Sequence, residues 1–124
     1  MKNAINWFEI PVNNLSRAKK FYSTIFNCDI NDMPMGGTNL KYAVFPFEQN
    51  GGVGGVLVEG KGYEPTVKGS LLYLNGGDDL SNVLSKVEKA GGKIVVPKTS
   101  VGPYGFIAHF KDSEGNKVGL HSRN

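Results

Sequence analysis

The sequence predicts an α+β fold made of two tandem βαβββ modules. Two segments carry apolar residues at helical spacing, and strand-like segments surround each of them. The halves also resemble each other, because NNLSRAKKFY and DDLSNVLSKV follow corresponding strands at a shift of 65 residues. Since this period is too long for a solenoid repeat, it indicates a duplicated module, and we expect two sheets facing each other around a cleft.

The length of 124 residues is consistent with a single domain, 1–124, that buries its own core. We expect module one at about 1–60 and module two at about 68–122. The segment GKGYEPTVKG, residues 60–69, has the proline and glycines of a joint between them. Cys28 is the only cysteine, which excludes an intramolecular disulfide and a thiolate zinc site.

Two helices are predicted from the apolar spacing. The first is expected over Leu15–Phe26, with Asn13 or Asn14 as its N-cap. The second helix is expected to begin after Asp78 or Asp79 and to end at Gly91. Its apolar face consists of Leu80, Val83, Leu84 and Val87.

Runs of β-branched and aromatic residues predict the strands, and glycine pairs mark the turns between them. The expected strands are Ile5–Val12, Lys41–Phe47, Val53–Glu59, Ser70–Asn75, Lys93–Val96, Tyr104–Lys111 and Lys117–Ser122, with a weaker one over Asp29–Met33. The glycine pairs are Gly36-Gly37, Gly51-Gly52 and Gly76-Gly77.

Charge and hydropathy exclude two classes of partner. The 14 Lys and Arg against 11 Asp and Glu give a net charge of +3, too small and scattered for a nucleic-acid footprint. The densest basic stretch, Arg17–Lys20, falls on the expected solvent side of the first helix. No stretch approaches the roughly 20 apolar residues of a membrane span. Because the first residues also lack a signal peptide, we expect a cytoplasmic protein.

The layout, the phrase INWFEIPVNNLSRAKKFYSTIFNCDI and the closing FKDSEGNKVGLHS resemble the vicinal oxygen chelate superfamily of glyoxalases, bleomycin-resistance proteins and extradiol dioxygenases. The resemblance implies a glyoxalase-like fold, in which each module curls into half of an open, cleft-lined barrel with the helices outside. It also implies a homodimer and, in enzymatic members, a divalent metal in the cleft. One such scaffold hosts many chemistries.

The resemblance places the four metal-ligand positions on Trp7, near Val56, near Gly69 and on Gly119. None of these side chains offers a lone pair suited to a divalent cation, which needs three or four N, O or S ligands. We therefore expect no metal and no other cofactor.

Strand alternation indicates which side chains line the cleft. In the first strand Phe8, Ile10 and Val12 form an apolar face for the helices, so Trp7 and Glu9 face the cleft.

The same argument places His121 on the face of Gly119, and Tyr73 and Asn75 on one cleft-lining face of the fifth strand. Glu9, Tyr73 and His121 are therefore expected to meet in a common pocket with Trp7 as its wall.

Glu9 and His121 are the candidate catalytic residues, because a carboxylate beside an indole and a histidine both suit proton transfer. Alternatively, Glu9 is held by backbone amides or a lysine, and His121 is a solvated strand end.

The candidate ligand-binding residues are Trp7, Tyr73, Asn75, Tyr104 and His109. His109 could face the cleft or the solvent, and Tyr104 with Lys98 belongs to a segment, KTSVGPYG, that could form a lid.

Three functions remain open from the sequence. The first is a metal-free protein that binds a small apolar or aromatic molecule between Trp7, Tyr73 and a second subunit. The second is a metal-dependent lyase or dioxygenase whose displaced site uses Glu9, His121 and His109. The third is a metal-free isomerase of a carbonyl compound with Glu9 as the base.

Overall fold

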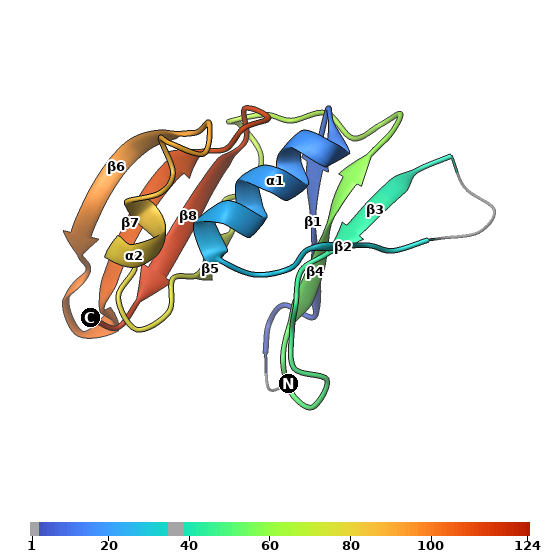
Figure 1. Ribbon diagram of the computed structural model, residues 1–124. Coiled ribbons are helices and arrows are strands. Elements are labelled where there is room, and N and C mark those ends of the chain that lie inside the picture. Colours follow the sequence, from blue (N-terminus) through green and yellow to red (C-terminus); the bar gives the residue numbers. More distant parts are fainter. Residues whose placement is uncertain (1–2, 35–38) are drawn as a thin grey trace.

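The computed structural model describes residues 3–34 and 39–124, so the predicted turn at Gly36-Gly37 lies outside the described residues. The elements follow each other in the order β1 (Trp7–Val12), α1 (Leu15–Phe26), β2 (Asn31–Asp32), β3 (Lys41–Val44), β4 (Gly54–Glu59), β5 (Tyr73–Asn75), α2 (Ser81–Leu84), β6 (Lys93–Ser100), the 3-10 helix η1 (Gly102–Tyr104), β7 (Phe106–Lys111) and β8 (Lys117–Ser122). Each half of the chain thus contains a βαβββ module (Figure 1).

The eight strands form two four-stranded sheets with the same internal order. Sheet A has the order β1-β4-β3-β2, and sheet B has the order β5-β8-β7-β6. In each sheet the first and last strands of the module pair in parallel, β1 with β4 and β5 with β8, while the other neighbours are antiparallel. This shared topology is the physical counterpart of the sequence repeat.

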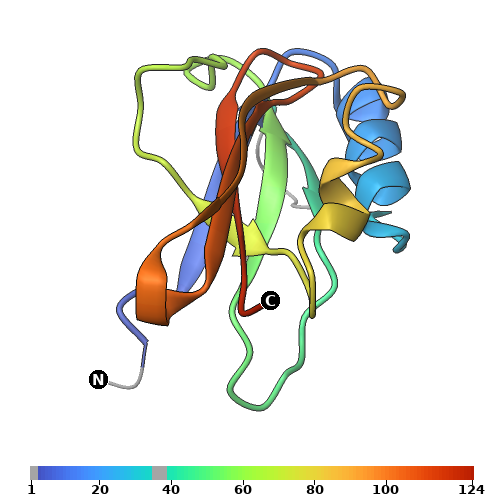
Figure 2. The same cartoon turned by 90° about the vertical axis from the view of Figure 1, so that its left-hand side faces the viewer.

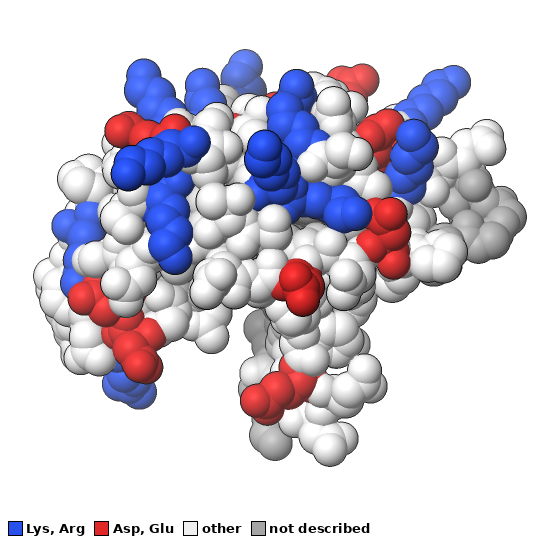
Figure 3. Space-filling model, viewed as in Figure 1, with Lys and Arg blue, Asp and Glu red and all other residues white. Residues whose placement is uncertain are grey.

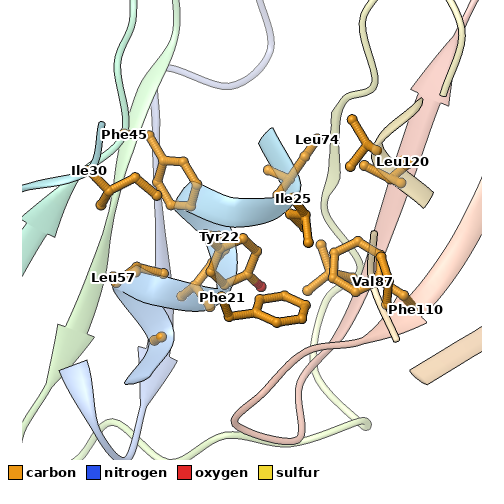
Figure 4. Close-up of a cluster of buried hydrophobic side chains, with 14 of the residues drawn as sticks. Phe21, Tyr22, Ile25, Ile30, Phe45, Leu57, Leu74, Val87, Phe110 and Leu120 are labelled. Carbon is orange, nitrogen blue, oxygen red and sulfur yellow. The ribbon is translucent and has the colours of Figure 1, made fainter. Parts of the chain in front are cut away.

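Helix α1 packs against both sheets at once. The ring of Phe21 lies 5.9 Å from that of Phe110 in sheet B, and the ring of Tyr22 lies 5.4 Å from that of Phe45, next to sheet A. Figure 4 shows these side chains in one continuous apolar cluster with residues of both sheets. The burial of this cluster is the main stabilising contribution to the fold.

The predicted α+β class is therefore confirmed, and the sheets do not close into a barrel (Figure 1). The helices fill the angle between the two sheets and gather on one side of them, as the turned view in Figure 2 shows. The apolar faces of both modules and of the helices share a single core.

The second module departs most from the sequence expectation. Regular helix in α2 ends at Leu84, since the following backbone bonds, Lys86 N to Val83 O and Val87 N to Leu84 O, have the tighter i to i−3 pattern. Strand β6 continues to Ser100 through two register shifts. Among the described residues, no helix is both long and apolar enough to cross a bilayer.

The turn between β7 and β8 joins the modules through a buried carboxylate. Glu114 accepts hydrogen bonds from the backbone N–H groups of Asn13 and Asn14, at 3.0 and 2.9 Å. Its other oxygen accepts one from Arg17 Nε at 2.7 Å. Module two thus supplies the acceptor for the start of a helix in module one.

Two more side chains of this turn complete the joint. Asp112 accepts a 2.6 Å hydrogen bond from the hydroxyl of Tyr22, and both residues are buried. Asn116 donates from Nδ2 to the carbonyl oxygen of Pro11 at 2.7 Å and accepts from the backbone N–H of Thr66 at 3.1 Å. The closing stretch DSEGN therefore fixes β1, α1 and the 60–72 connection relative to sheet B.

Basic side chains are dispersed over the face that carries the helices. Figure 3 shows Lys and Arg along its upper edge and over the helices, with Asp and Glu between them. Within the stretch Arg17–Lys20, Arg17 pairs with Glu114 at 2.7 Å and Lys19 pairs with Asp32 at 2.8 Å. Two of its charges are thus engaged by carboxylates of the same chain.

Candidate functional site

The predicted site residues of β1 lie on the face of sheet A that points away from the helices, here called its open face. Ile10 and Val12 are buried against the helices, whereas Trp7 and Glu9 alternate to the opposite face. Trp7 is 42% exposed. The alternation predicted for β1 is therefore the one that the structure shows.

Trp7 and Glu9 line a groove of about 440 Å³ between β1 and the second module. The opposite wall comes from the connection that leads into β5 and from the start of β8, including Thr66, Leu72 and Lys117. This volume lies within the usual range of small-molecule sites. The groove combines an indole, a carboxylate and an ammonium group.

A second aromatic ring extends the open face of sheet A beside Trp7. Phe47 meets Trp7 edge to face, with ring centroids 5.8 Å apart and an interplanar angle of 85°. The ring of Phe47 lies over Gly54, where an added Cβ would sit 2.5 Å from Cδ1 of the ring. The absence of a side chain at Gly54 thus allows this aromatic pair to cover the strand.

Tyr63 is a site residue that sequence reasoning missed. Its hydroxyl donates a 3.1 Å hydrogen bond to Oε1 of Glu9, and this bond raises the pKa of Tyr63. Tyr63 belongs to the 60–69 segment, which the glycines and Pro65 mark only as a joint. No local sequence signal indicates that this segment folds back over β1, since the two residues are 54 positions apart.

The open face of sheet B carries a hydrogen-bonded pair of side chains, Tyr73 and His109. Tyr73, Gly119 and His109 lie side by side on β5, β8 and β7. The hydroxyl oxygen of Tyr73 is 2.7 Å from Nε2 of His109, and its ring covers Gly119. His109 thus lies on the same face as Gly119, which settles the orientation that the sequence left open.

The surroundings of His109 favour its neutral form. Burial is the largest effect that lowers the pKa of His109, and the charge of Lys117 lowers it further. Its Nδ1 is buried and has no hydrogen-bond partner among the residues described. Both effects disfavour the protonated imidazole, and Tyr73 engages one of its ring nitrogens.

His121 and Asn75 occupy the next row of the same face, because they are register partners on β8 and β5. His121 Nε2 lies 2.6 Å from the backbone carbonyl oxygen of Tyr104 in η1. Asn75 accepts a 2.9 Å hydrogen bond from the backbone N–H of Gly77. Four of the predicted ligand-binding residues, Tyr73, Asn75, Tyr104 and His109, thus gather on or beside the open face of sheet B.

The structure does not bring Glu9 together with His121 and Tyr73. Glu9 lies on sheet A with Tyr63 as its partner, whereas His121 and Tyr73 lie on sheet B with other partners. The helices fill the angle between the sheets, so both open faces lie on the outside of the chain. Among the described residues, Glu9 shares its groove with Lys117 of β8 but not with His121 or Tyr73.

The predicted lid segment is mostly regular structure. Lys98 belongs to β6, pairs with Asp79 at 2.9 Å and stands 4.6 Å from the ring centre of Phe106, away from the open face. Tyr104 ends the short helix η1, whose turn is closed by a bond from Val101 N to Gly105 O. The segment is thus a tight hairpin connection that presents Tyr104.

A family model for the Glyoxalase/Bleomycin resistance protein/Dioxygenase superfamily matches residues 4–120, which is nearly the whole chain. The chain belongs to this superfamily. The duplicated topology described above is thus that of a glyoxalase-superfamily chain.

Curated relatives named as glyoxylases or glyoxylase-like proteins match over 96% of this chain. A "Glyoxylase-like domain-containing protein" of Didymella fabae is 32% identical over 123 residues, covering 96% of this chain and 93% of that protein. The "Putative glyoxylase CFP32" of Mycobacterium bovis is 27% identical over 121 residues, 96% of this chain. This chain spans only 45% of the length of CFP32.

Among solved structures, TnmS3 of Streptomyces sp. CB03234, described as an antibiotic binding protein, superposes with a TM-score of 0.68. It is 23% identical, and the match covers 98% of this chain and 97% of TnmS3. At this identity the likeness shows a shared glyoxalase-superfamily fold.

The positions that the resemblance assigns to metal ligands do not fit a divalent cation. Trp7 is an indole, Val56 is buried on sheet A, Gly69 precedes β5, and Gly119 is covered by the ring of Tyr73. None of these four side chains has a donor atom for Mg²⁺, Zn²⁺ or iron. Within residues 3–34 and 39–124, no three His, Cys, Asp or Glu side chains are grouped to hold an ion.

The three ligands of the hypothetical displaced metal site, Glu9, His109 and His121, do not lie together in one chain. His109 and His121 both lie on the open face of sheet B. The displaced-site hypothesis requires His109 to have this orientation. Glu9, the third ligand, lies on sheet A. The three side chains therefore cannot coordinate one ion within a single protomer.

Proposed function

We propose that this protein binds a small apolar or aromatic molecule, without a metal ion, on open sheet faces that a second copy closes into a cleft. The observation that carries this proposal is the aromatic character of the open faces. Trp7 stands where the resemblance places a metal ligand and is 42% exposed, and Tyr73 covers Gly119, another such position, while 47% exposed. Exposed aromatic groups beside a few polar ones are typical of small-molecule sites.

The arrangement of the sheets supports a homodimer. In one chain the helices occupy the angle between the sheets, so each open face is only one wall of a cleft. A symmetric partner would place a second open face opposite the first and bury exposed side chains such as Phe47 and Tyr104. The description of TnmS3 as an antibiotic binding protein is consistent with a binding role on this fold.

Ligand binding can be measured directly, because Trp7 is the only tryptophan of the chain and lies in the groove. Uncharged two-ring and three-ring aromatic compounds should quench or shift its fluorescence saturably, and calorimetry should give the same affinity. In the Trp7→Ala variant calorimetric binding should weaken at least about tenfold. The matched control, Val67→Ala, changes an exposed side chain outside both sheets and should bind normally.

A measurement of metal content tests the proposal that the protein works without a metal ion. Protein purified without chelator, then reconstituted separately with nickel, zinc, manganese or iron(II), should retain no stoichiometric metal by mass spectrometry. Near-stoichiometric metal that is lost on Glu9→Gln or His121→Asn would contradict the metal-free proposal. It would support the lyase or dioxygenase alternative.

A metal-free isomerase is the second candidate, and the contact between Tyr63 and Glu9 favours it. A carboxylate in a groove, held by one phenol at 3.1 Å, is positioned to accept a proton from a carbonyl compound. Turnover should then depend on pH, resist chelators and disappear in Glu9→Gln. A Glu9→Gln protein with unchanged turnover would exclude this role.

A further inference from the structure

We infer that His121 and Asn75 form an acceptor and donor pair that recognises a lactam, a cyclic amide with its N–H and C=O side by side, on a planar ligand. The inference rests on the proposed binding function and specifies its ligand class. It follows from the hydrogen-bond state of each side chain, their spacing on the sheet, and the aromatic groups around them.

The tautomer of His121 is fixed by its backbone partner. Nε2 lies 2.6 Å from the carbonyl oxygen of Tyr104, and a carbonyl oxygen can only accept a hydrogen bond. Nε2 therefore carries the proton, and in neutral His121 the lone pair is on Nδ1. Nδ1 has no hydrogen-bond partner within the described part of the chain. His121 thus presents a free acceptor.

Asn75 presents a free hydrogen-bond donor. Its Oδ1 accepts a 2.9 Å hydrogen bond from the backbone N–H of Gly77, which fixes the orientation of the amide. The Nδ2 amino group is left with two N–H donors, for which the described residues supply no acceptor. Because Asn75 is exposed, a ligand can reach these donors.

The two free groups are neighbours on the same face. Asn75 and His121 are register partners on the adjacent parallel strands β5 and β8, which lie about 4.8 Å apart in a sheet. Side chains of such partners project together from one face. A ligand group that matches them must offer an N–H to His121 and a carbonyl oxygen to Asn75 within one planar edge, as a lactam does.

Aromatic groups on either side favour a planar ring system. Tyr104, whose carbonyl holds His121, has a side chain that is 78% exposed. Tyr73 lies two residues before Asn75 on the same face and is 47% exposed. Rings of this kind bind flat aromatic ligands by stacking and edge contacts. The class of ligand is therefore an aromatic lactam.

The probes are 2-quinolinone, an aromatic lactam, and N-methyl-2-quinolinone, which has the same ring and carbonyl but no N–H donor. Calorimetry with the full chain should show 2-quinolinone binding at least about tenfold more tightly, because the methylated probe leaves His121 Nδ1 unpaired and crowded. The His121→Phe variant should lose this preference. A preference of less than twofold in the natural protein would overturn the inference.

Asn75→Asp provides the sharpest variant, since it replaces the donor by an acceptor and keeps the oxygen that accepts from Gly77. It should weaken 2-quinolinone binding at least about tenfold. Asn82→Asp is the matched control, an exposed residue of α2, and should leave the affinity unchanged. Thermal unfolding of each variant verifies that it is folded.

The outcomes separate this inference from the proposed function. If both quinolinones bind equally well and Asn75→Asp has no effect, aromatic binding stands and the lactam assignment is wrong. If neither quinolinone nor any other aromatic compound binds, the proposed function itself fails. Selective binding that depends on both His121 and Asn75 supports the two together.

Discussion

The ring of Tyr73 crosses Gly119 and brings its hydroxyl oxygen to 2.7 Å from Nε2 of His109, two strands away. An added Cβ at Gly119 would lie 2.5 Å from Cδ1 of this ring, so a side chain there is incompatible with the observed position. The absence of a side chain at Gly119 thus allows an aromatic ring to cover the strand.

Gly119→Ala should therefore raise the pKa of His109. The methyl group displaces the ring of Tyr73, and burial is the main effect that lowers the pKa of this histidine. An NMR titration of the imidazole protons measures the change. Tyr73→Phe is the control, because it retains the covering ring and should leave the pKa of His109 lowered. Identical titration curves for Gly119→Ala and the natural protein would show that the ring does not bury His109.

Tyr22→Phe should destabilise the fold by about 1–3 kcal/mol, since it removes the 2.6 Å donor to the buried carboxylate of Asp112. Urea unfolding at neutral pH gives this free energy. Tyr42→Phe is the control: Tyr42 is half-buried on β3, its hydroxyl has no hydrogen-bond partner among the described residues, and the substitution should change stability by less than about 0.5 kcal/mol. Equal effects of the two substitutions would argue against a stabilising role for the bond between Tyr22 and Asp112.

Glu114 should make the fold sensitive to acid. Burial alone would raise the pKa of Glu114, but hydrogen bonds from Arg17, from the Asn14 backbone and from Ser113 outweigh it and lower the pKa. A carboxyl group whose pKa is lower in the folded protein stabilises it above its unfolded pKa, and this contribution is lost as the pH falls through the folded value. Stability should thus decrease below the ordinary glutamate pKa of about 4.3.

Urea unfolding across this pH range checks the prediction. Glu114→Gln should reduce stability at neutral pH and flatten the decrease at acid pH, because the amide does not titrate. Glu64→Gln, at an exposed position without an ion pair in the described chain, should leave the curve unchanged. A Glu114→Gln protein with the same acid dependence as the natural one would assign the effect to another carboxylate.

Local patterns predicted the first module well. The helix spans Leu15–Phe26 as expected, and Asn14 caps it by accepting a 3.0 Å bond from the backbone N–H of Arg17. The alternation of β1 separated Trp7 from Ile10 correctly. These features depend on residues within one helical turn or one strand, so the sequence pattern carries them directly.

The remaining features depend on contacts between distant residues. The packing of α1 against both sheets arises from rings such as Phe21 and Phe110, 89 positions apart in the chain. The contact of Tyr63 with Glu9 depends on where a glycine-containing connection folds, which local propensity does not specify. For the same reason, the separation of Glu9 from His121 became visible only in the arrangement of the two sheets.

The open face of sheet A should be part of a dimer interface. Trp7 and Phe47, 42% and 38% exposed, form an edge-to-face pair on the outside of one chain. Light scattering coupled to size exclusion should give twice the 13.4 kDa of a single chain. Trp7→Glu should shift the equilibrium toward monomer, because burying a charge without a partner in an interface is costly. Val67→Glu, on the connection between the modules, serves as the control and should remain dimeric. A natural protein that stays monomeric at high micromolar concentration would require the cleft to be completed in another way, and it would limit the binding site to a single open face.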